Sequence, residues 1–477
     1  MCAASHTSGR GESCKSVLHF RKTTRGVIMR NRPTKVQFQQ KIEHIKELLQ
    51  HAMMDGTYKA GQFLPAEKQL ERMFGVSNYA LRGALDQLEQ EGWIEKIASI
   101  GNKVAAQRPP VKLMLVCNAV MERNLQLSGL LEDFHRLYPW ITIHMVESGG
   151  QYNPNREYHD LVMLDNVQFQ YAIETYGTNV FAPLHVNTRM YRKIEQMFYC
   201  DNRQHMRSIV VSPLVLCYNK AHFRELGLAE PDGSWTWEDL IHHAEMLSDG
   251  KGRYGFTFLI QSMYRWPLFL LQSGERFERE KGQVQSIMGS KLLQSITTSK
   301  NILHNRKAVP FYLSESNSDI DRMFIEGKLS MTLNTYMGLN SWNDSNIEYD
   351  IAPVPHIHQM STFVLGLGIG VTRASSHLEE AKLFIEYCAS ERAQQHIWNQ
   401  TLSAPSLATL PCTLNDKTLY TPSRYMLYRE TLGTFRSLTE LNIPISSFQK
   451  LTNLMKQYWA EMLDEQQLCE RISLEIK

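Results

Sequence analysis

The histidine pairs are the first residues in this sequence that could do chemistry, because imidazole is the commonest metal ligand. His242 and His243 are adjacent, and His356 and His358 are two residues apart, whereas a helical metal pair is usually spaced i, i+4. No carboxylate-rich motif accompanies them, and neither a G-x-S-x-G motif nor a G-x-x-x-x-G-K-[ST] loop occurs. We therefore expect no enzymatic activity, no metal and no cofactor.

A second group of residues suits DNA recognition. Asn78 and Arg82 lie one helical turn apart. An asparagine amide offers a donor and an acceptor side by side, which suits adenine, and an arginine contacts guanine or phosphate. Ser77 precedes them and can cap a helix by accepting a bond from a first-turn N–H.

The surrounding pattern predicts the elements that would position these side chains. Pro65 suits a first helical position, and Leu70, Met73 and Phe74 repeat at helical spacing. A second periodic run holds Leu81, Ala84 or Leu85, and Leu88, and ends at Gly92. Short β-prone runs at 93–97 and 103–105 flank a turn. An earlier helix carries an apolar face of Ile42, Ile45, Leu49 and Ala52. This is the layout of a winged helix-turn-helix.

Over about 70 residues, from the helix that carries Ile42 through the link 55–61 to the hairpin, the chain resembles the DNA-binding domain of GntR-type transcription regulators, through "LPAEK", "FGVSNYALRGAL" and "LEQEG". The resemblance implies that the second helix enters the major groove and that the hairpin lies near the backbone or minor groove. It implies the following DNA contacts: Lys68, Ser77, Asn78, Tyr79, Arg82, Asn102 and Lys103.

Several positions depart from the family pattern. Lys68 and Asn78 stand where arginine is usual, Ala80 replaces a threonine, and Ser99 replaces a glycine. Residues 35–107 hold nine Lys/Arg and nine Asp/Glu, so charge does not favour DNA binding, which usually depends on phosphate contacts. A degenerate domain kept for folding or dimerisation is the alternative.

Composition and length divide the remaining chain. The 477 residues, with 43% hydrophobic and 21% charged residues, predict two or three soluble domains. Residues 1–34, with seven Lys/Arg and one acid, predict a disordered basic arm, although Met29 is an equally acceptable start. Residues 35–107 form the winged helix, 108–110 a linker, and 111–477 a second domain. The scattered cysteines and the lack of a long apolar run predict a cytoplasmic protein with reduced thiols, without a membrane partner.

The second domain alternates strands with helices, which predicts an α/β fold with a mostly parallel sheet. The apolar runs 111–116, 141–146 and 161–164 are the first predicted strands. Five later segments resemble, in family order, extracellular solute-binding proteins of the maltose-binding type: 212–228, 235–240, 324–331, 349–355 and 366–394. The resemblance implies two α/β lobes that close on a ligand. The fold class is therefore multidomain α/β, a small α+β winged helix followed by a two-lobed domain.

Ligands of open α/β sheets bind beyond the carboxyl ends of strands. We expect contacts from residues just past predicted strand ends. They are Asp165 and Asn166, the cluster Tyr264-Arg265-Trp266, and the stretch from Asn334 to Trp342, in which Asn334, Tyr336 and Trp342 are the main candidates. Each has a plainer interpretation, because aromatic residues are more often core and Asp165 could only cap a helix. The helix that contains Leu451, Leu454, Met455 and Trp459 is expected to complete the second lobe, with dimerisation as the alternative.

These patterns predict a ligand-responsive transcription regulator that binds a two-fold operator as a homodimer and senses a small molecule, by resemblance a mono- or oligosaccharide. The competing hypothesis is a cytoplasmic solute-binding protein whose DNA-binding domain has degenerated. An exported receptor would require an apolar leader segment, which the sequence does not show.

Overall fold

The computed structural model describes residues 35–54, 57–105, 110–148, 150–156, 158–310, 316–414, 417 and 419–476. The chain divides into two compact units, Met1–Arg108 and Pro109–Lys477. The predicted arm 1–34, the alternative start Met29 and most of the linker 108–110 lie outside the described residues. No helix in the described ranges is long and apolar enough to cross a membrane.

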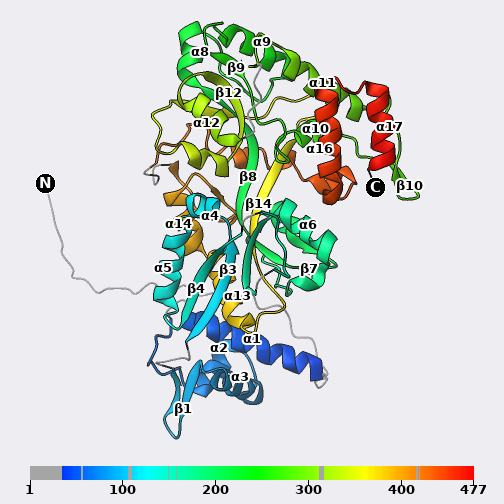
Figure 1. Cartoon of the computed structure of the whole chain (residues 1–477). Helices are drawn as coiled ribbons and strands as arrows, with labels where there is room; N and C mark the ends of the chain where they lie inside the picture. The colour runs from blue at the N-terminus through cyan, green and yellow to red at the C-terminus, as the bar shows by residue number, and fades with distance from the viewer. Residues whose placement is uncertain are drawn as a thin grey trace, which may run out of the picture. The chain divides into compact units, whose positions relative to one another are not determined.

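Unit 1 is a helix-turn-helix followed by a hairpin (Figure 1). Its elements are α1 (Lys35–Met54), α2 (Glu67–Phe74), α3 (Asn78–Gln90), β1 (Ile94–Ile97) and β2 (Gly101–Val104). The predicted face of α1 is buried at Ile42, Ile45 and Leu49, and packs with the buried face of α3. The prediction for α2 was partly wrong. Leu70 is fully buried, but Met73 is 57% exposed, because this two-turn helix directs only one position into the core.

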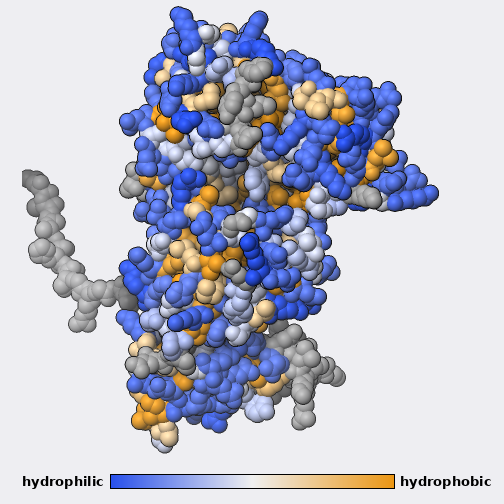
Figure 2. Space-filling view, viewed as in Figure 1, coloured by the Kyte–Doolittle hydropathy of each residue, from blue (hydrophilic) through white to orange (hydrophobic). Residues whose placement is uncertain are grey.

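The β1–β2 hairpin has a sharp turn. Ser99 has φ 61, the left-handed conformation that a glycine would adopt with less strain. On the face shown in Figure 2, hydrophilic residues cover most of the surface, and an apolar area lies over this hairpin. Ile100, at the hairpin tip, is 69% exposed. The tip therefore presents an apolar side chain to solvent.

Unit 2 is built on one ten-stranded sheet with the order β4-β3-β5-β14-β8-β12-β9, to which β13, β15 and β16 add at the side. Its strands are β3 (Val111–Cys117), β4 (Ile141–Glu147), β5 (Leu161–Asp165), β8 (Met206–Asn219), β9 (Tyr254–Phe256), β12 (Leu329–Thr335), β13 (Tyr349–Ala352), β14 (Thr362–Val371), β15 (Ala404–Pro405) and β16 (Phe435–Arg436). Two small hairpins are β6 (Tyr199–Cys200) with β7 (Arg203–Gln204), and β10 (Arg279–Glu280) with β11 (Gln283–Val284).

Helices cover this sheet (Figure 1). The α-helices are α4 (Ala119–Leu125), α5 (Leu127–Leu137), α6 (Asn166–Tyr176), α7 (Arg192–Glu195), α8 (Lys220–Leu226), α9 (Trp237–Leu247), α10 (Pro267–Gln272), α11 (Lys291–His304), α12 (Asn317–Ile325), α13 (Leu378–Cys388), α14 (Glu391–Gln400), α15 (Leu427–Glu430), α16 (Ile445–Trp459) and α17 (Glu465–Glu475). The short 3-10 helices are η1 (Thr178–Val180), η2 (Gln196–Phe198), η3 (Met337–Trp342), η5 (Leu432–Thr434) and η6 (Leu438–Leu441).

Two long strands connect the lobes of unit 2. The first half of β8 pairs with β14 and the second half pairs with β12 and β13, so the change of partner occurs near Pro213. Lobe 1 contains β3, β4 and β5, and lobe 2 contains β9, β12 and β13. The prediction of a mostly parallel sheet was wrong. β3 is parallel to β4 and β5, but β14 is antiparallel to β5 and β8, and β8 is also antiparallel to β12 and β13, because both strands return between the lobes.

Close packing explains the alternating glycines of β14. A Cβ on Gly366 would lie 2.7 Å from Ile194, and one on Gly368 would lie 2.8 Å from Phe198. The side chains of the last long helix, α16, are buried at Leu451, Leu454, Met455 and Trp459, and α16 packs against α6, α11 and α17. The helix thus packs within its own domain, and its contact with α6, which follows β5 of lobe 1, extends beyond the second lobe to which the sequence assigned it.

Candidate DNA-binding face and ligand cavity

The start of α3 presents the predicted DNA-contacting side chains to solvent. Ser77 caps the helix, since its hydroxyl accepts a bond from the Ala80 N–H at 3.3 Å. Tyr79 is 76% exposed, and its ring stacks on Phe38 of α1 with centroids 5.2 Å apart. The Arg82 side chain is 65% exposed. These exposed groups share the first turn and a half of the helix.

Two carboxylates of α2 hold this face together. Glu67 accepts a bond from Arg82 Nε at 2.9 Å and one from Asn78 Nδ2 at 3.3 Å. Glu71 also accepts a bond from Asn78 Nδ2. The Glu67 hydrogen bond and charge raise the pKa of Arg82, which keeps the guanidinium fully charged.

Lysines neutralise the acids of the other half of α3. Lys96 pairs with Asp86 and with Glu89, the latter at 3.0 Å. Lys46 of α1, with 8% of its side chain exposed, pairs with Glu91 at 2.9 Å. Burial alone would lower the pKa of Lys46, but its bonds to Glu43 and Glu91 raise it overall. The acids that seemed to oppose DNA binding in the sequence are thus paired within the domain.

The remaining predicted DNA contacts have mixed placements. Lys68 is exposed, and Lys103 is half-buried opposite Glu95 in the hairpin. Asn102 is only 7% exposed, and its backbone carbonyl accepts a bond from Leu64 N at 2.8 Å. The structure contradicts the prediction for Asn102, because a buried side chain beside the strand that leads into α2 cannot reach a duplex.

A cavity with a polar lining lies in unit 2, beyond the carboxyl ends of β5 and β12, and has a volume of about 730 Å³. Three of the predicted ligand-contacting residues line it: Asp165, Tyr264 and Asn334. Its other polar lining comes mainly from α4, α12 and the segment around Arg265: Asn118, Arg123, Asn124, Gln168, Arg265, Asn317, Ser318, Asp321, Arg322, Glu326, Thr335 and Ser341. Among the described residues that line it, Tyr264 is the only aromatic one.

A hydrogen bond across this cavity joins the lobes. Asp165 ends β5 in lobe 1 and accepts a bond at 3.0 Å from the hydroxyl of Tyr264, which follows β9 in lobe 2. The same carboxylate caps α6 by accepting bonds from Val167 N and Gln168 N, each at 2.8 Å. Burial raises the pKa of Asp165 despite these donors. Asp165 is therefore both a helix cap and a cavity residue.

A buried arginine and a half-buried aspartate form one wall of the cavity. Arg265 donates to the Leu333 carbonyl at 3.1 Å and to Asn334 Oδ1 at 3.2 Å. Burial lowers its pKa to about 10, so it is a cation at neutral pH. Burial also raises the pKa of Asp321, whose Oδ1 accepts a bond from the indole of Trp342 at 2.8 Å. This wall offers a fixed cation and carboxyl and amide oxygens, which suit a polar ligand.

Four predicted ligand contacts are structural instead. The Asn166 side chain is buried and joins α6 to β14, because it accepts a bond from Gly366 N at 3.0 Å and donates to the Val364 carbonyl at 3.4 Å. Trp266 is 1% exposed, donates to Thr452 at 3.2 Å and packs edge-on against Trp459.

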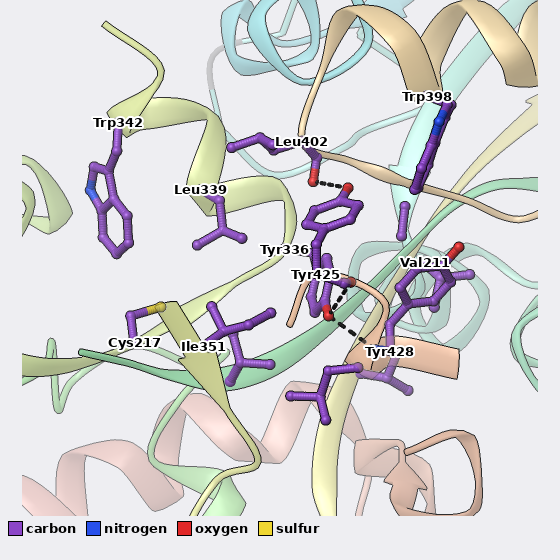
Figure 3. Close-up of a cluster of buried hydrophobic side chains, with 14 of the residues drawn as sticks. Val211, Cys217, Tyr336, Leu339, Trp342, Ile351, Trp398, Leu402, Tyr425 and Tyr428 are labelled. Atoms are coloured by element: carbon purple, nitrogen blue, oxygen red, sulfur yellow. Dashed lines mark hydrogen bonds between the residues drawn. The ribbon is translucent and has the colours of Figure 1, made fainter. Parts of the chain in front are cut away.

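Tyr336 and Trp342 belong to the hydrophobic core of unit 2 (Figure 3). The Tyr336 hydroxyl donates to the Tyr425 carbonyl at 2.9 Å and accepts from Tyr428 N at 3.0 Å. Leu339 lies between Tyr336 and Trp342 in sequence and is also fully buried. In η3 residues three apart lie on one face, so this face turns inward while Gly338 and Ser341 line the cavity.

Some residues that line the cavity were not predicted, because the helices that carry them show no recognisable motif in the sequence. Asn118, Arg123 and Asn124 lie at the start of α4 or within it, a segment for which the sequence predicted no ligand contact. Asp321 lies within an ordinary amphipathic helix. Arg265, in contrast, belongs to the predicted cluster 264–266 and lines the cavity.

Comparisons with known proteins agree with both folds. Residues 41–104 match the family described as bacterial regulatory proteins, gntR family, and residues 204–395 match the family described as bacterial extracellular solute-binding protein. This chain joins a GntR-type domain to a solute-binding domain. The probable transcriptional regulator PhnF of Escherichia coli (strain K12) is 40% identical over 84 residues, which are 18% of this chain and 32% of PhnF. The chain thus spans about a third of this curated relative.

Solved solute-binding proteins share the fold of the larger domain. The Listeria monocytogenes ABC substrate-binding protein Lmo0181, in complex with cycloalternan, aligns with a TM-score of 0.63 and 17% identity over 76% of this chain and 97% of its own. The maltose-bound T. maritima MalE3 aligns with a TM-score of 0.65 and 16% identity over 76% of this chain and 98% of MalE3. The GacH receptor of Streptomyces glaucescens GLA.O aligns with a TM-score of 0.66 and 14% identity over 77% of this chain and 97% of the receptor. At these identities the likeness establishes the fold alone.

Proposed function

We propose that this chain is a cytoplasmic, ligand-responsive transcription regulator. The GntR-type domain binds operator DNA, and the solute-binding domain senses a small polar molecule, with a mono- or oligosaccharide as the first candidate. The observation that carries the proposal is the presence, in one chain, of an exposed Asn78–Tyr79–Arg82 face on α3 and a polar cavity between two lobes. A homodimer on a two-fold operator would give each domain a matching half-site.

The proposed mechanism is linkage between the two binding events. A ligand that contacts both lobes stabilises the conformation in which they approach. If that conformation also changes how two DNA-binding domains are spaced, ligand and DNA affinities change by the same factor. Two observations support a saccharide as the ligand. The cavity is lined by side chains that can form hydrogen bonds with sugar hydroxyls, and solved proteins that share the fold of this domain were found with saccharides bound.

A second candidate is a solute-binding protein whose DNA-binding domain has degenerated. The observation that favours it is the engagement of Asn78 and Arg82 by Glu67 and Glu71, which places carboxylates beside the DNA-facing side chains. The two candidates differ in one property, the preference for a specific duplex over a scrambled one at near-physiological salt.

The bond between the lobes gives a direct test of the sensor. Tyr264→Phe removes the hydroxyl that Asp165 accepts from, while the backbone bonds that cap α6 remain. We expect a larger radius of gyration in small-angle X-ray scattering of the unliganded protein, and sugar binding weakened by about threefold to tenfold, the effect of one lost hydrogen bond. Tyr171→Phe, which removes the hydroxyl of a half-buried tyrosine of α6 that does not line the cavity, is the control. Equal scattering and affinity in both variants would show that this bond does not hold the lobes.

A further inference from the structure

Asn78 stands where arginine is usual in the GntR-type pattern, and its side chain has a defined orientation. It begins α3 and is exposed. Its amide nitrogen faces two carboxylates of α2, Glu67 Oε2 at 3.3 Å and Glu71 Oε1. Glu67 and Glu71 lie one helical turn apart, so the two carboxylates bracket one side of the asparagine.

The hydrogen-bonding inventory fixes which end of the amide is available. An ionised carboxylate only accepts hydrogen bonds, and an amide nitrogen carries two hydrogens. The two carboxylates therefore orient the nitrogen toward α2 and take both of its hydrogens. The Oδ1 atom, which only accepts, is the part of the Asn78 amide left for a partner outside the domain.

Arg82 is oriented by the same carboxylate. Its Nε donates to Glu67 Oε2 at 2.9 Å, and Glu67 also accepts from Asn78. The two terminal nitrogens of the guanidinium remain available as a fork, the geometry that binds guanine or phosphate. Residues 78 and 82 are four apart on α3 and face one side of the helix. Glu67 thus positions an acceptor and a donor fork one turn apart.

We propose that Asn78 determines specificity as a lone acceptor, which binds the exocyclic amino group of adenine or cytosine in the major groove. This rests on the proposed DNA-binding function. In the major groove adenine and cytosine each present an amino donor, whereas guanine and thymine present only acceptors on their polar edges. The position contacted by Asn78 therefore accepts adenine and cytosine and rejects guanine and thymine. The sequence-based expectation was a bidentate contact, in which the Asn78 amide nitrogen also donates a hydrogen bond to the base. Such a contact would accept adenine alone, because adenine presents both an amino donor and an acceptor in the major groove and cytosine presents only the amino donor.

The test is a selection of binding sites from a random duplex pool by the full chain and three variants. Asn78→Ala removes the acceptor. Glu71→Ala frees one amide hydrogen of Asn78, which permits the bidentate contact. Glu95→Ala, an exposed acid of β1, is the control that removes the same charge. Circular dichroism establishes that each variant is folded. Affinities are then measured on duplexes with each base at the affected position, and on one whose adenine lacks the amino group.

We expect the native chain to bind the adenine and cytosine duplexes within about threefold of each other and the others about threefold to tenfold more weakly, the range for one neutral hydrogen bond. Asn78→Ala should bind all four duplexes with similar affinity. It should also bind the duplex whose adenine lacks the amino group as tightly as the ordinary adenine duplex. Glu71→Ala should narrow the position to adenine, and Glu95→Ala should leave it unchanged.

Two other outcomes have separate meanings. If the native chain enriches no motif, the proposed DNA-binding function itself fails. If it enriches a motif in which no position depends on Asn78, or in which the Asn78 position accepts adenine alone, the lone-acceptor inference is overturned and the proposed function stands.

Discussion

Trp342→Ala is expected to lower the free energy of unfolding of the solute-binding domain by about 3–5 kcal/mol, the range for truncating a buried tryptophan. The ring is 2% exposed and packs on Phe324 and Tyr349. Its indole N–H is also the donor to Asp321, so the substitution removes a partner from a half-buried carboxyl group. Urea denaturation monitored by circular dichroism measures the change.

The matched control is Tyr199→Ala, since Tyr199 is an aromatic residue with 43% exposure in the same domain. We expect it to change the free energy of unfolding by less than about 1 kcal/mol, as is usual for exposed positions. A loss below about 1 kcal/mol for Trp342→Ala, together with weaker sugar binding, would restore the sequence-based prediction that Trp342 is a ligand platform.

Arg82→Ala is expected to abolish the preference of the chain for its operator over a scrambled duplex, with at least a tenfold loss of specific affinity from one lost guanidinium contact. Asn78 is still held by Glu71 in this variant, so the loss reports the fork itself. Ligand affinity should stay unchanged, because the residues that line the ligand cavity belong to the other domain. Fluorescence anisotropy and isothermal titration calorimetry measure the two affinities.

Arg72→Ala separates specific contact from charge. Arg72 is exposed on α2 and belongs to the same domain, so its removal changes the net charge equally. We expect it to weaken binding to both duplexes alike and to preserve their ratio. If Arg72→Ala and Arg82→Ala had the same effect on that ratio, the exposed face of α3 would not be the source of specificity.

The sequence predicted the GntR-type domain well because its structure depends on local chemistry. The cap Ser77, the left-handed Gly75 and the apolar spacing of α3 each determine their own segment. The orientation of Asn78 could not be predicted in this way. It depends on two glutamates of the preceding helix, whose side chains reach α3 only after the turn has formed.

The cavity was harder to predict because a strand end does not determine which way the next side chains point. Asp165 and Asn334 lie at strand ends and line the cavity, as expected. Past β12, however, the chain continues as a 3-10 helix, and its three-residue period directs Tyr336, Leu339 and Trp342 into the core. The three-residue spacing of these side chains was visible in the sequence. Tyr336 and Trp342 were nevertheless interpreted as ligand contacts and not as part of a buried face.

The regulator hypothesis depends most directly on sequence-specific DNA binding. Fluorescence anisotropy should be measured for the purified full chain on labelled DNA from upstream of its own gene, beside a scrambled duplex, at low and near-physiological salt and with and without a sugar panel. We expect the upstream duplex to keep its affinity at near-physiological salt while the scrambled duplex loses it, and we expect one sugar to change the difference between the two affinities. Equal binding to both duplexes, or none, under every ligand condition would contradict the regulator hypothesis and leave the solute-binding domain as the functional part of the chain.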